Sequence, residues 1–366
     1  MTNFAARQEF KFINSKKIKN RIVLAPLTHN MSEENGDLSK DEIDWLAKCG
    51  LGGFGMLITA ATSVSPDGRC WQGQPGLFTD AQQYQFKEIA DNAKKSDTLA
   101  IVQLHHGGIR TAQQYSHAQP VAPSEVALNS ITPDGARELS RNEIDTLIQN
   151  FVDSAERAYR AGMSGIEIHA AFNFLLSNFS NPLLNKRTDQ WGGSFENRSR
   201  VLFTIVSQIR NKLPRDFIIG VRLSPENYSH FSGIDINEQI ELANELTKLN
   251  IDYIHMSLHD AFKMPDHNTE DSQSLLEWIK EKLDPNIPLI VAGKISTIKD
   301  ADKAITLGAD FVALGTTAVG NPDWVNKVNA GEALIEAPYS TGHLVNLGFN
   351  TASIDYLSSI SGLVAA

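Results

Sequence analysis

Eight short apolar runs alternate along the chain with segments of helical periodicity. The runs are RIVLAP from Arg21, GMLIT from Gly55, LAIVQLH from Leu99, GIEIH from Gly165, FIIGVRL from Phe217, DYIHMSL from Asp252, PLIVAG from Pro288 and DFVALG from Asp310. Continuous apolar runs rich in Ile, Val and Leu indicate strands of a parallel sheet, which are joined by crossover helices. Eight such units predict an α/β fold, the (β/α)₈ TIM barrel, with a doubly wound sheet as the alternative.

The segments between the runs carry helix signals. Ser39 with Glu42, and Ser140 with Glu143, fit the capping box, in which each side chain bonds the other's backbone N–H. An apolar stripe after Ser140 predicts a helix packed on the sheet; it comprises Ile144, Leu147, Ile148, Phe151, Val152, Ala155, Ala158 and Tyr159. Before the first strand, FKFINSKKIKNR alternates around a turn and predicts an N-terminal β-hairpin that closes the bottom of the barrel.

No linker rich in Pro or Ser divides the chain, so we expect residues 1–366 to form a single domain. With 42% hydrophobic and 21% charged residues, the composition is that of an ordinary globular protein. No apolar stretch has the length of a membrane span, and MTNFAARQEFKF lacks the hydrophobic centre of a signal peptide. We therefore expect a cytoplasmic protein without a membrane partner.

Charge and cysteine content exclude further classes of function. A net charge of −10 without any Lys/Arg block argues against nucleic acid as a partner. Only Cys49 and Cys70 are present, so neither a disulfide framework nor a cysteine-ligated cluster can be built, and no metal site is expected. A small-molecule partner is the expectation that remains.

Polar residues or glycine end most of the apolar runs, where a barrel carries its chemistry. They are Thr28 after the first run, Gln103 in the third with His105 and His106 at its end, His169 in the fourth, Arg222 in the fifth, and Gly293 and Gly315 after the last two. Side-chain donors and acceptors suit a planar polar ring, whereas glycines let backbone N–H groups approach a phosphate. Polar side chains after some strands and glycines after the last two therefore predict a site for flavin mononucleotide (FMN), which has a polar ring and a phosphate.

Several stretches resemble the old yellow enzyme family of FMN-dependent NAD(P)H oxidoreductases, particularly its bacterial branch. They are NRIVLAPLTHN, GMLITAATSVSPDG, IVQLHHGG, GIEIH, NKRTDQWGGSFENRSR, GVRLSPE and GADFVALG with NPDW, in the family's order across roughly residues 10 to 330. The resemblance implies an oxidoreductase with FMN as its cofactor and NADH or NADPH as its reductant. It also implies a small-molecule electron acceptor, which the sequence does not identify.

The resemblance assigns roles to residues around the flavin. Ala25, Pro26, Leu27 and Thr28 match the segment along one side of the ring, with the Thr28 hydroxyl near the C4 carbonyl. Ala61 and Gln103 match residues at the pyrimidine end. Arg222 matches the arginine beside N1 and O2, where a fixed cation stabilises the anionic hydroquinone. His169 matches the donor that holds a substrate's carbonyl or nitro oxygen, so Thr28, His169 and Arg222 are the predicted catalytic residues.

The chain departs from the family after His169. Three and five positions later the family has His or Asn and then Tyr, but this chain has Phe172 and Phe174. The changes remove one donor to the substrate oxygen and the phenol that protonates the substrate carbon, so enone reduction is expected to be slow. Asn173 could replace the lost donor if the loop shifts by one residue. We expect an altered substrate pocket formed by His169, Phe172, Asn173 and Phe174; packing under the loop is the alternative for the phenylalanines.

A second departure lies at the phosphate end. The family usually has Gly-Arg where this chain has Gly315 and Thr316, so backbone amides near Gly293 and Gly315, with Thr316 and Lys294, would hold the phosphate. Weaker retention of FMN is expected. The extended loop after the fourth strand, with Ser194 capping the next helix, is interpreted as scaffold.

Three functions compete at this point. The first is an FMN-dependent NAD(P)H oxidoreductase of old yellow enzyme type, and the second is a flavin-binding protein with little or no turnover. The third, a different FMN barrel such as a hydroxy-acid oxidase or dihydroorotate dehydrogenase, would need another order of motifs. The apolar C-terminal segment from His343 could pack on the barrel or on a second copy, so a homo-oligomer is one expectation.

Overall fold

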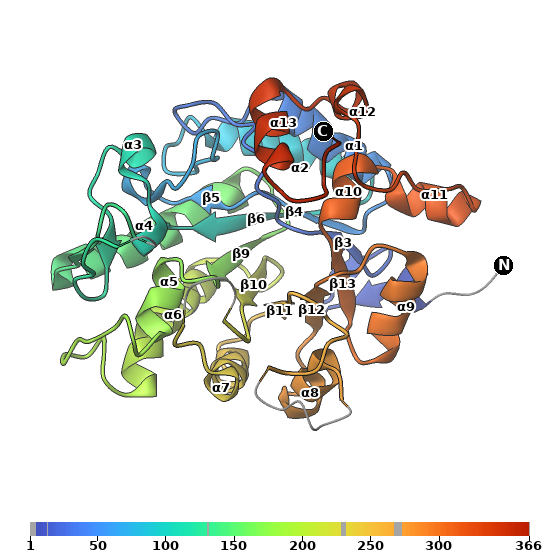
Figure 1. The fold of residues 1–366 in the computed structure, drawn as a ribbon. Coiled ribbons are helices and arrows are strands. Elements are labelled where there is room, and N and C mark those ends of the chain that lie inside the picture. Colours follow the sequence, from blue (N-terminus) through green and yellow to red (C-terminus); the bar gives the residue numbers. More distant parts are fainter. Residues whose placement is uncertain (1–4, 13, 130–131, 228–231, 267–272, 366) are drawn as a thin grey trace.

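Eight parallel strands close into a barrel in the computed structural model, which describes residues 5–12, 14–129, 132–227, 232–266 and 273–365 (Figure 1). The barrel strands are β3 (Ile22–Leu24), β4 (Met56–Ile58), β6 (Leu99–His105), β9 (Gly165–Ala170), β10 (Ile218–Leu223), β11 (Tyr253–Ser257), β12 (Leu289–Ala292) and β13 (Phe311–Leu314). Each pairs in parallel with its neighbours, and the β4–β6 pairing completes the ring. The predicted TIM barrel is confirmed, with each strand inside or within one residue of its apolar run.

Helices follow the strands around the outside of the barrel (Figure 1). They are α1 (Lys40–Leu51), α2 (Gln83–Lys95), α4 (Arg141–Arg160), α6 (Phe195–Lys212), α7 (Ile236–Thr247), α8 (Leu275–Lys282) and α9 (Ile298–Thr306), with α10 (Thr316–Gly320) and α11 (Trp324–Ala330) after β13. The Ser140–Glu143 capping box is present. The prediction that Tyr159 belongs to the buried stripe of α4 is wrong: 45% of Tyr159 is exposed, and its ring meets the Phe217 ring edge-on at 5.5 Å between centroids.

The predicted capping box at α1 forms only in part. The Ser39 hydroxyl accepts from the Glu42 backbone N–H, as expected. The Glu42 carboxylate does not bond back to Ser39; it accepts a hydrogen bond from Ser32 Oγ at 2.5 Å and lies 3.4 Å from His29 Nε2. Glu42 is fully buried, so it joins the loop after β3 to the helix.

The N-terminal hairpin forms from β1 (Phe10–Lys11) and β2 (Lys17–Ile18), which pair antiparallel; Ile13 in the turn lies outside the described residues. The Phe12 ring stacks on Phe311 of β13 at 5.3 Å between centroids. Phe12 and Ile18 belong to the same buried cluster as the residues that fill the barrel interior. The hairpin therefore closes the N-terminal end of the barrel.

The loop after β9 contains a helix that the sequence analysis missed, α5 (Leu175–Ser180). Beyond α5 the loop is fixed by side-chain bonds to backbone oxygens. Asn185 Nδ2 donates to Phe179 and Trp191, and Arg187 Nη1 donates to Pro123 and Leu139. Ser194 caps α6 as predicted.

The C-terminal segment packs on its own barrel through α12 (Thr341–Leu347) and α13 (Thr351–Ser358). The Phe349 ring lies 5.5 Å from Trp45 of α1, and Tyr339 pairs with Val364.

Smaller elements complete the described part of the chain: β5 (Thr62–Ser63), β7 (Val121–Ala122), β8 (Arg137–Glu138), α3 (Gln113–Ser116), η1 (Ala5–Arg7), η2 (Pro66–Gly68) and η3 (Gly108–Arg110). In the part of the chain that the structure describes, no helix has the length and apolar character of a membrane span.

Candidate active site

The register of three adjacent strands, β6, β9 and β10, places polar side chains inside the C-terminal half of the barrel. Alternate residues of a strand face the same side, so Gln103 and His105 of β6 point inward together, as do Glu167 and His169 of β9. Gln103 pairs with Glu167 across the strands, and His169 pairs with Arg222 of β10. The strand order thus gathers these groups without any long loop.

A hydrogen-bond network centred on Glu167 lies beneath this end of the barrel. Glu167 accepts from Gln103 Nε2 at 2.7 Å, from His255 Nδ1 at 2.9 Å and from the Tyr253 hydroxyl at 3.1 Å. Burial raises the pKa of Glu167, but the charges of His255 and Arg222 and the hydrogen bonds outweigh it, so the pKa lies below its ordinary value. An ionised Glu167 holds the amide nitrogen of Gln103 and thereby orients its side chain.

Glycine at position 220 makes room for that network. A methyl group on Gly220 would lie 2.0 Å from the ring of Tyr253, its partner in the adjacent strand. No side chain could occupy this place without displacing the ring. The sequence GVRL on β10 therefore lets Tyr253 cross the barrel interior.

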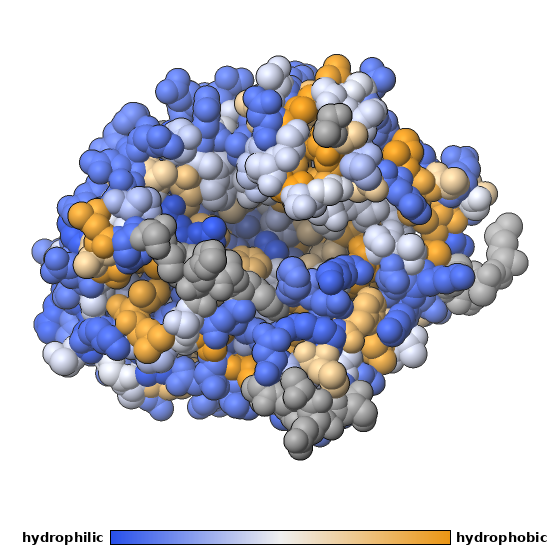
Figure 2. Space-filling model, viewed as in Figure 1, coloured by the Kyte–Doolittle hydropathy of each residue, from blue (hydrophilic) through white to orange (hydrophobic). Residues whose placement is uncertain are grey.

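A cavity of about 770 Å³ opens at the C-terminal ends of β3, β10, β11, β12 and β13. Its lining includes nine predicted site residues: Ala25, Pro26, Leu27, Phe172, Arg222, Gly293, Lys294, Gly315 and Thr316. The space-filling view shows a hollow near the centre of the molecule (Figure 2). The volume is in the range of small-molecule sites, and the lining comes from residues far apart in the sequence.

Arg222 is the buried cation of this cavity. Its Nη2 donates to Ser257 Oγ at 2.7 Å, and its Cζ lies 5.3 Å from the centroid of the Phe172 ring. Its Nε is buried and has no hydrogen-bond partner among the described residues. A buried N–H group without a partner is costly, so the site fits a ligand that offers an acceptor here.

The other end of the cavity is formed by backbone and small side chains. Gly293 has a φ of +148°, and a Cβ there would lie 2.6 Å from the Leu258 carbonyl oxygen, so this turn requires glycine. Thr316 is exposed at the start of α10. Lys294 Nζ is exposed and lies 3.3 Å from Asp260, so its charge is already paired. The donor set of amides and a hydroxyl fits a phosphate, with no arginine among the residues that form this end.

His169 lies beside the cavity in contact with a second histidine. Its Nδ1 is 3.0 Å from His105 Nδ1, and both imidazoles are buried. The Phe174 ring meets His105 edge-on at 4.3 Å and lies 5.1 Å from His169. Arg110 lies over the other side of Phe174, 4.2 Å from its centroid. Phe174 therefore packs within the histidine cluster and is not among the residues that line the cavity.

Phe172 and Asn173 hold an unusual backbone conformation. Their φ angles are +56° and +53°, a region that bulky L-residues rarely adopt. Hydrogen bonds fix this turn: the Phe172 N–H donates to Ser224 Oγ, and its carbonyl accepts from Arg110 Nη1, both at 3.0 Å. The turn places Phe172 at the cavity. The Asn173 Oδ1 instead accepts from Asn181 Nδ2 at 3.0 Å, so the expectation that Asn173 replaces a donor at the substrate is not supported.

Thr28 and Ala61 lie near the cavity but are not part of its lining. A hydrogen bond links Thr28 to Tyr356 of α13; burial raises the pKa of Tyr356, while this bond and Arg110 oppose the shift. The Ala61 carbonyl accepts from Gln74 Nε2 at 3.0 Å. Tyr356 is a neighbour that sequence reasoning missed, because no local signal connects a C-terminal helix to the end of β3.

Sequence reasoning also missed six lining residues: Leu258, His259, Ala292, Ile295, Ser296 and Ala313. Leu258 and His259 follow β11, which is the sixth apolar run. Residues at the end of this run were not considered as site candidates, although they occupy the same kind of position as the others. Among the described residues no three His, Cys, Asp or Glu side chains are grouped to hold a metal ion.

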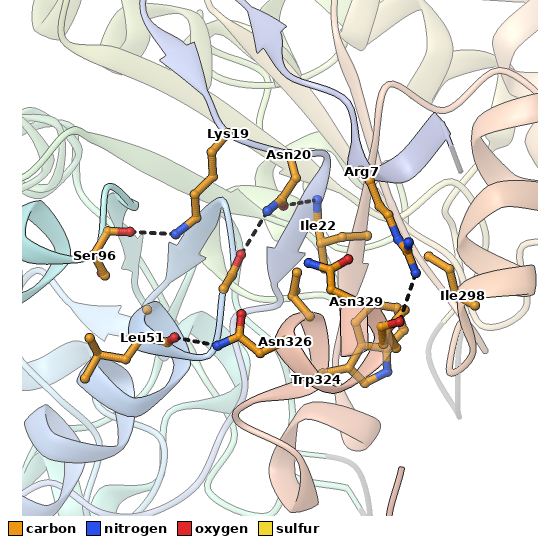
Figure 3. Close-up of a pocket in the computed structure, with 14 residues that line it drawn as sticks. Arg7, Lys19, Asn20, Ile22, Leu51, Ser96, Ile298, Trp324, Asn326 and Asn329 are labelled. Carbon is orange, nitrogen blue, oxygen red and sulfur yellow. Dashed lines mark hydrogen bonds between the residues drawn. The ribbon is translucent and has the colours of Figure 1, made fainter. Parts of the chain in front are cut away.

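A smaller cavity of about 350 Å³ lies at the N-terminal end of β3 (Figure 3). Its polar side chains bond backbone oxygens: Lys19 bonds Ser96, Asn20 bonds Gly53 and Asn326 bonds Leu51, at 2.6, 2.9 and 2.9 Å. These bonds join loops at the N-terminal end of the barrel, which in TIM barrels contributes to stability. Active sites of TIM barrels lie at the opposite, C-terminal end.

Comparison with known proteins agrees with this geometry. Residues 10–334 match the sequence profile of the NADH:flavin oxidoreductase / NADH oxidase family. A Bacillus subtilis protein described as a probable NADH-dependent flavin oxidoreductase, YqiG, is 33% identical over 329 residues, covering 88% of this chain and 87% of the relative. An NADPH dehydrogenase of Clostridium acetobutylicum is 32% identical over 326 residues, covering 86% and 91%. The solved structure of an old yellow enzyme homologue from Zymomonas mobilis matches with a TM-score of 0.81 at 26% identity, covering 96% of this chain and 99% of that chain.

Proposed function

Because the chain belongs to the NADH:flavin oxidoreductase / NADH oxidase family, we propose that its barrel cavity binds FMN for the transfer of electrons from NADH or NADPH to a small-molecule acceptor. The single observation that carries the proposal is the convergence of Arg222, Gly293 and Gly315 on one cavity. Family membership supports FMN as the cofactor and a nicotinamide as the reductant. The names of the two relatives described above specify a nicotinamide and no acceptor.

Bound FMN supplies a ring that can take up hydride from a nicotinamide and release electrons to an acceptor. Arg222 would face the part of the ring where negative charge gathers, since its Nε has no hydrogen-bond partner in the part of the chain that the structure describes and the guanidinium is already oriented by Ser257. Gln103 would present its side chain to the pyrimidine end, oriented by Glu167. The amides near Gly293 and Gly315 would hold the phosphate.

His169 would hold the oxygen of the acceptor above the ring. Phe172 at the cavity, next to Arg222, makes the acceptor side aromatic, which favours a flat or apolar acceptor such as a quinone or nitroarene. Phe174 provides no proton where the family has a phenol. Acceptors that need a proton delivered to carbon are therefore expected to react slowly, whereas acceptors that take electrons onto oxygen are not.

A flavin-binding protein with little turnover is the second candidate. Phe172, Phe174 and Thr316 favour it, because each removes a polar group that the family uses. Arg222 and His169 favour the enzyme, since a protein without catalysis has no physical need for a buried cation at the ring and an imidazole beside it.

The experiment mixes the FMN-loaded protein with excess NADH or NADPH under anaerobic conditions and follows the flavin absorbance. The proposal expects bleaching with at least one nicotinamide, then recovery of the absorbance when a quinone or nitroarene is added, faster than with an enone. Absence of bleaching with both nicotinamides would favour the binding protein. An enone that restores the absorbance faster than every quinone and nitroarene would contradict the assigned acceptor class.

A further inference from the structure

The contact between His105 and His169 couples the protonation of two buried imidazoles. Their Nδ1 atoms are 3.0 Å apart, with ring centroids at 5.0 Å. Such a contact is a hydrogen bond only if one Nδ1 carries a proton and the other does not. Burial, and then the charge of neighbouring groups, holds the pKa of both histidines well below its ordinary value, so both are neutral at pH 7. One ring is therefore protonated on Nδ1 and the other on Nε2.

Cys70 lies beside the other ring nitrogen of His105. Its Sγ lies 3.6 Å from His105 Nε2, and 3.7 Å from the Gly68 carbonyl oxygen. Burial raises the pKa of Cys70 to about 12, so the thiol keeps its proton. The Gly68 carbonyl oxygen competes for the single S–H proton. The imidazole nitrogen is slightly nearer, and the sulfur would be a weak acceptor for a proton on Nε2, so the favoured arrangement has S–H donating to Nε2. His105 then carries its own proton on Nδ1.

We propose that His105 is a positioning residue that fixes His169 as the tautomer protonated on Nε2. The donors run in one direction: Cys70 Sγ–H to His105 Nε2, then His105 Nδ1–H to His169 Nδ1. The Nε2–H of His169 can then donate to an acceptor's oxygen, because the lone pair on its Nδ1 already accepts the hydrogen bond from His105. The donation from His169 to an acceptor's oxygen rests on the proposed function, whereas the assignment of the His169 tautomer does not.

The arrangement is a chain and not a metal site. The sulfur lies on the far nitrogen of His105, so the three groups cannot converge on one ion. Phe174 adds to the fixed geometry, because its edge meets the His105 ring at 4.3 Å. An aromatic neighbour offers no competing hydrogen-bond partner, so the two imidazoles bond each other.

The direct test is a long-range ¹H–¹⁵N spectrum of protein labelled at histidine, which reports the tautomer of each ring. The wild-type protein at pH 7 is expected to show His169 protonated on Nε2 and His105 on Nδ1. His169 protonated on Nδ1, or an even mixture, would overturn the proposal. The readout needs neither turnover nor an acceptor, so it stands if the proposed function fails.

Variants separate positioning from packing. His105→Phe removes the bond but keeps the ring, and should leave His169 as a mixture of tautomers. His105→Asn places an amide near the Nδ1 position and should restore the Nε2–H form. Cys70→Ala removes the donor on the far side and should produce a mixture at both rings. The exposed His117, whose left-handed φ of 55° suits asparagine, provides the matched control His117→Asn, which should change neither signal. An unchanged His169 tautomer in His105→Phe would contradict the proposal.

Binding of 4-chlorophenol to the FMN-loaded protein, measured by calorimetry, tests the consequence for an acceptor's oxygen. His105→Phe is expected to weaken binding in proportion to the fraction of His169 that loses the Nε2–H form, about twofold for an even mixture, and His105→Asn to recover it. If neither variant changes the dissociation constant while the NMR result holds, the role of His169 toward oxygen ligands is wrong. If the wild-type protein shows no flavin reduction but the tautomers are as expected, the proposed function alone fails.

Discussion

At the scale of single residues, Phe174 is the position at which the family resemblance implies a tyrosine, and its packing shows how a phenyl ring is held there. The ring is held between Arg110 at 4.2 Å and His105 at 4.3 Å. A tyrosine ring would fit the same contacts, because it differs only by its hydroxyl. The chemistry of this position can therefore be tested without disturbing the fold.

Phe174→Tyr is expected to raise the rate of enone reduction roughly 100-fold, because a positioned proton donor contributes on that order. Reduction of the flavin by the nicotinamide should stay within about twofold, since that step needs no proton donor at this position. Stopped-flow measurement of both half-reactions checks the prediction. The matched control is Phe203→Tyr on α6, a partly buried residue outside the cavity, which should change neither rate. An unchanged enone rate in Phe174→Tyr would mean that the missing phenol does not limit this reaction.

Thr316 is the position at which we expect an arginine to strengthen retention of FMN. It is exposed at the phosphate end of the cavity, and Lys294 nearby is paired with Asp260. Thr316→Arg is expected to strengthen FMN binding about 10-fold, because a guanidinium bonds phosphate with two parallel hydrogen bonds. The rate at which flavin is lost during dialysis measures the change. The control is Thr351→Arg, because Thr351 is an exposed threonine on α13, whereas the neighbouring Thr317 is buried and an arginine there would disturb packing. Equal rates of flavin loss from the wild type and Thr316→Arg would contradict it.

The candidate residues whose position follows from strand direction are those that line the cavity most directly. Arg222 and Gly293 both line it, because parallel strands present their C-terminal ends on one side of the barrel. Asn173 was placed wrongly beside the substrate, because two consecutive residues with positive φ turn its side chain toward Asn181. Hydrophobic periodicity carries no information on such a turn. Tyr356 depends on tertiary packing alone.

At the scale of elements, apolar runs located the strands because strands buried on both faces leave little choice of residue. The short helix α5 was missed because its six residues are fewer than the roughly 11 to 18 over which amphipathic periodicity can be recognised. The prediction of a complete capping box at α1 is wrong for another reason. A glutamate three residues after Ser39 fits the capping box, but the buried partner Ser32 competes for the same carboxylate.

This link between loop and helix gives a pH-dependent prediction. Burial raises the pKa of Glu42 to about 8, although the Ser32 hydrogen bond opposes the shift. Between an unfolded value near 4.5 and 8, the folded protein holds a proton that the unfolded chain releases, so this group's contribution to stability falls as pH rises. Glu42→Gln removes the titrating group. The stability of the wild type relative to Glu42→Gln should therefore fall by up to about 1.4 kcal/mol per pH unit between pH 6.5 and 8.

Urea denaturation at several pH values measures that difference. His29, whose pKa burial lowers to about 4, has the opposite slope between pH 4 and 6.5. Because His29 lies 3.4 Å from Glu42, the two groups are coupled, and the difference is read between pH 6.5 and 8, above the range in which His29 titrates. Glu143→Gln is the control, because hydrogen bonds to Arg137 and Ser140 lower the pKa of Glu143 to about 2, and its slope lies below pH 4.5. A difference that stays flat from pH 6.5 to 8 for Glu42→Gln would show that Glu42 is ionised in the folded protein.

At the scale of the whole molecule, the two ends of the barrel have separate tasks. The N-terminal hairpin fills one end through Phe12 and Ile18, and the smaller cavity there is lined by side chains that bond backbone oxygens. The other end holds the Glu167 network below the cavity. Because the buried network is supported from beneath by an apolar core, the polar site can be rigid before any ligand binds.

The central claim is that this cavity binds FMN, with the phosphate held by amides after β12 and β13. Calorimetric titration of the flavin-free protein with FMN and with riboflavin, which lacks the phosphate, tests it most directly. The account predicts one FMN per chain and binding at least about 100-fold weaker for riboflavin, the worth of two charge-assisted hydrogen bonds. Equal affinity for the two flavins, or no binding of FMN, would contradict it.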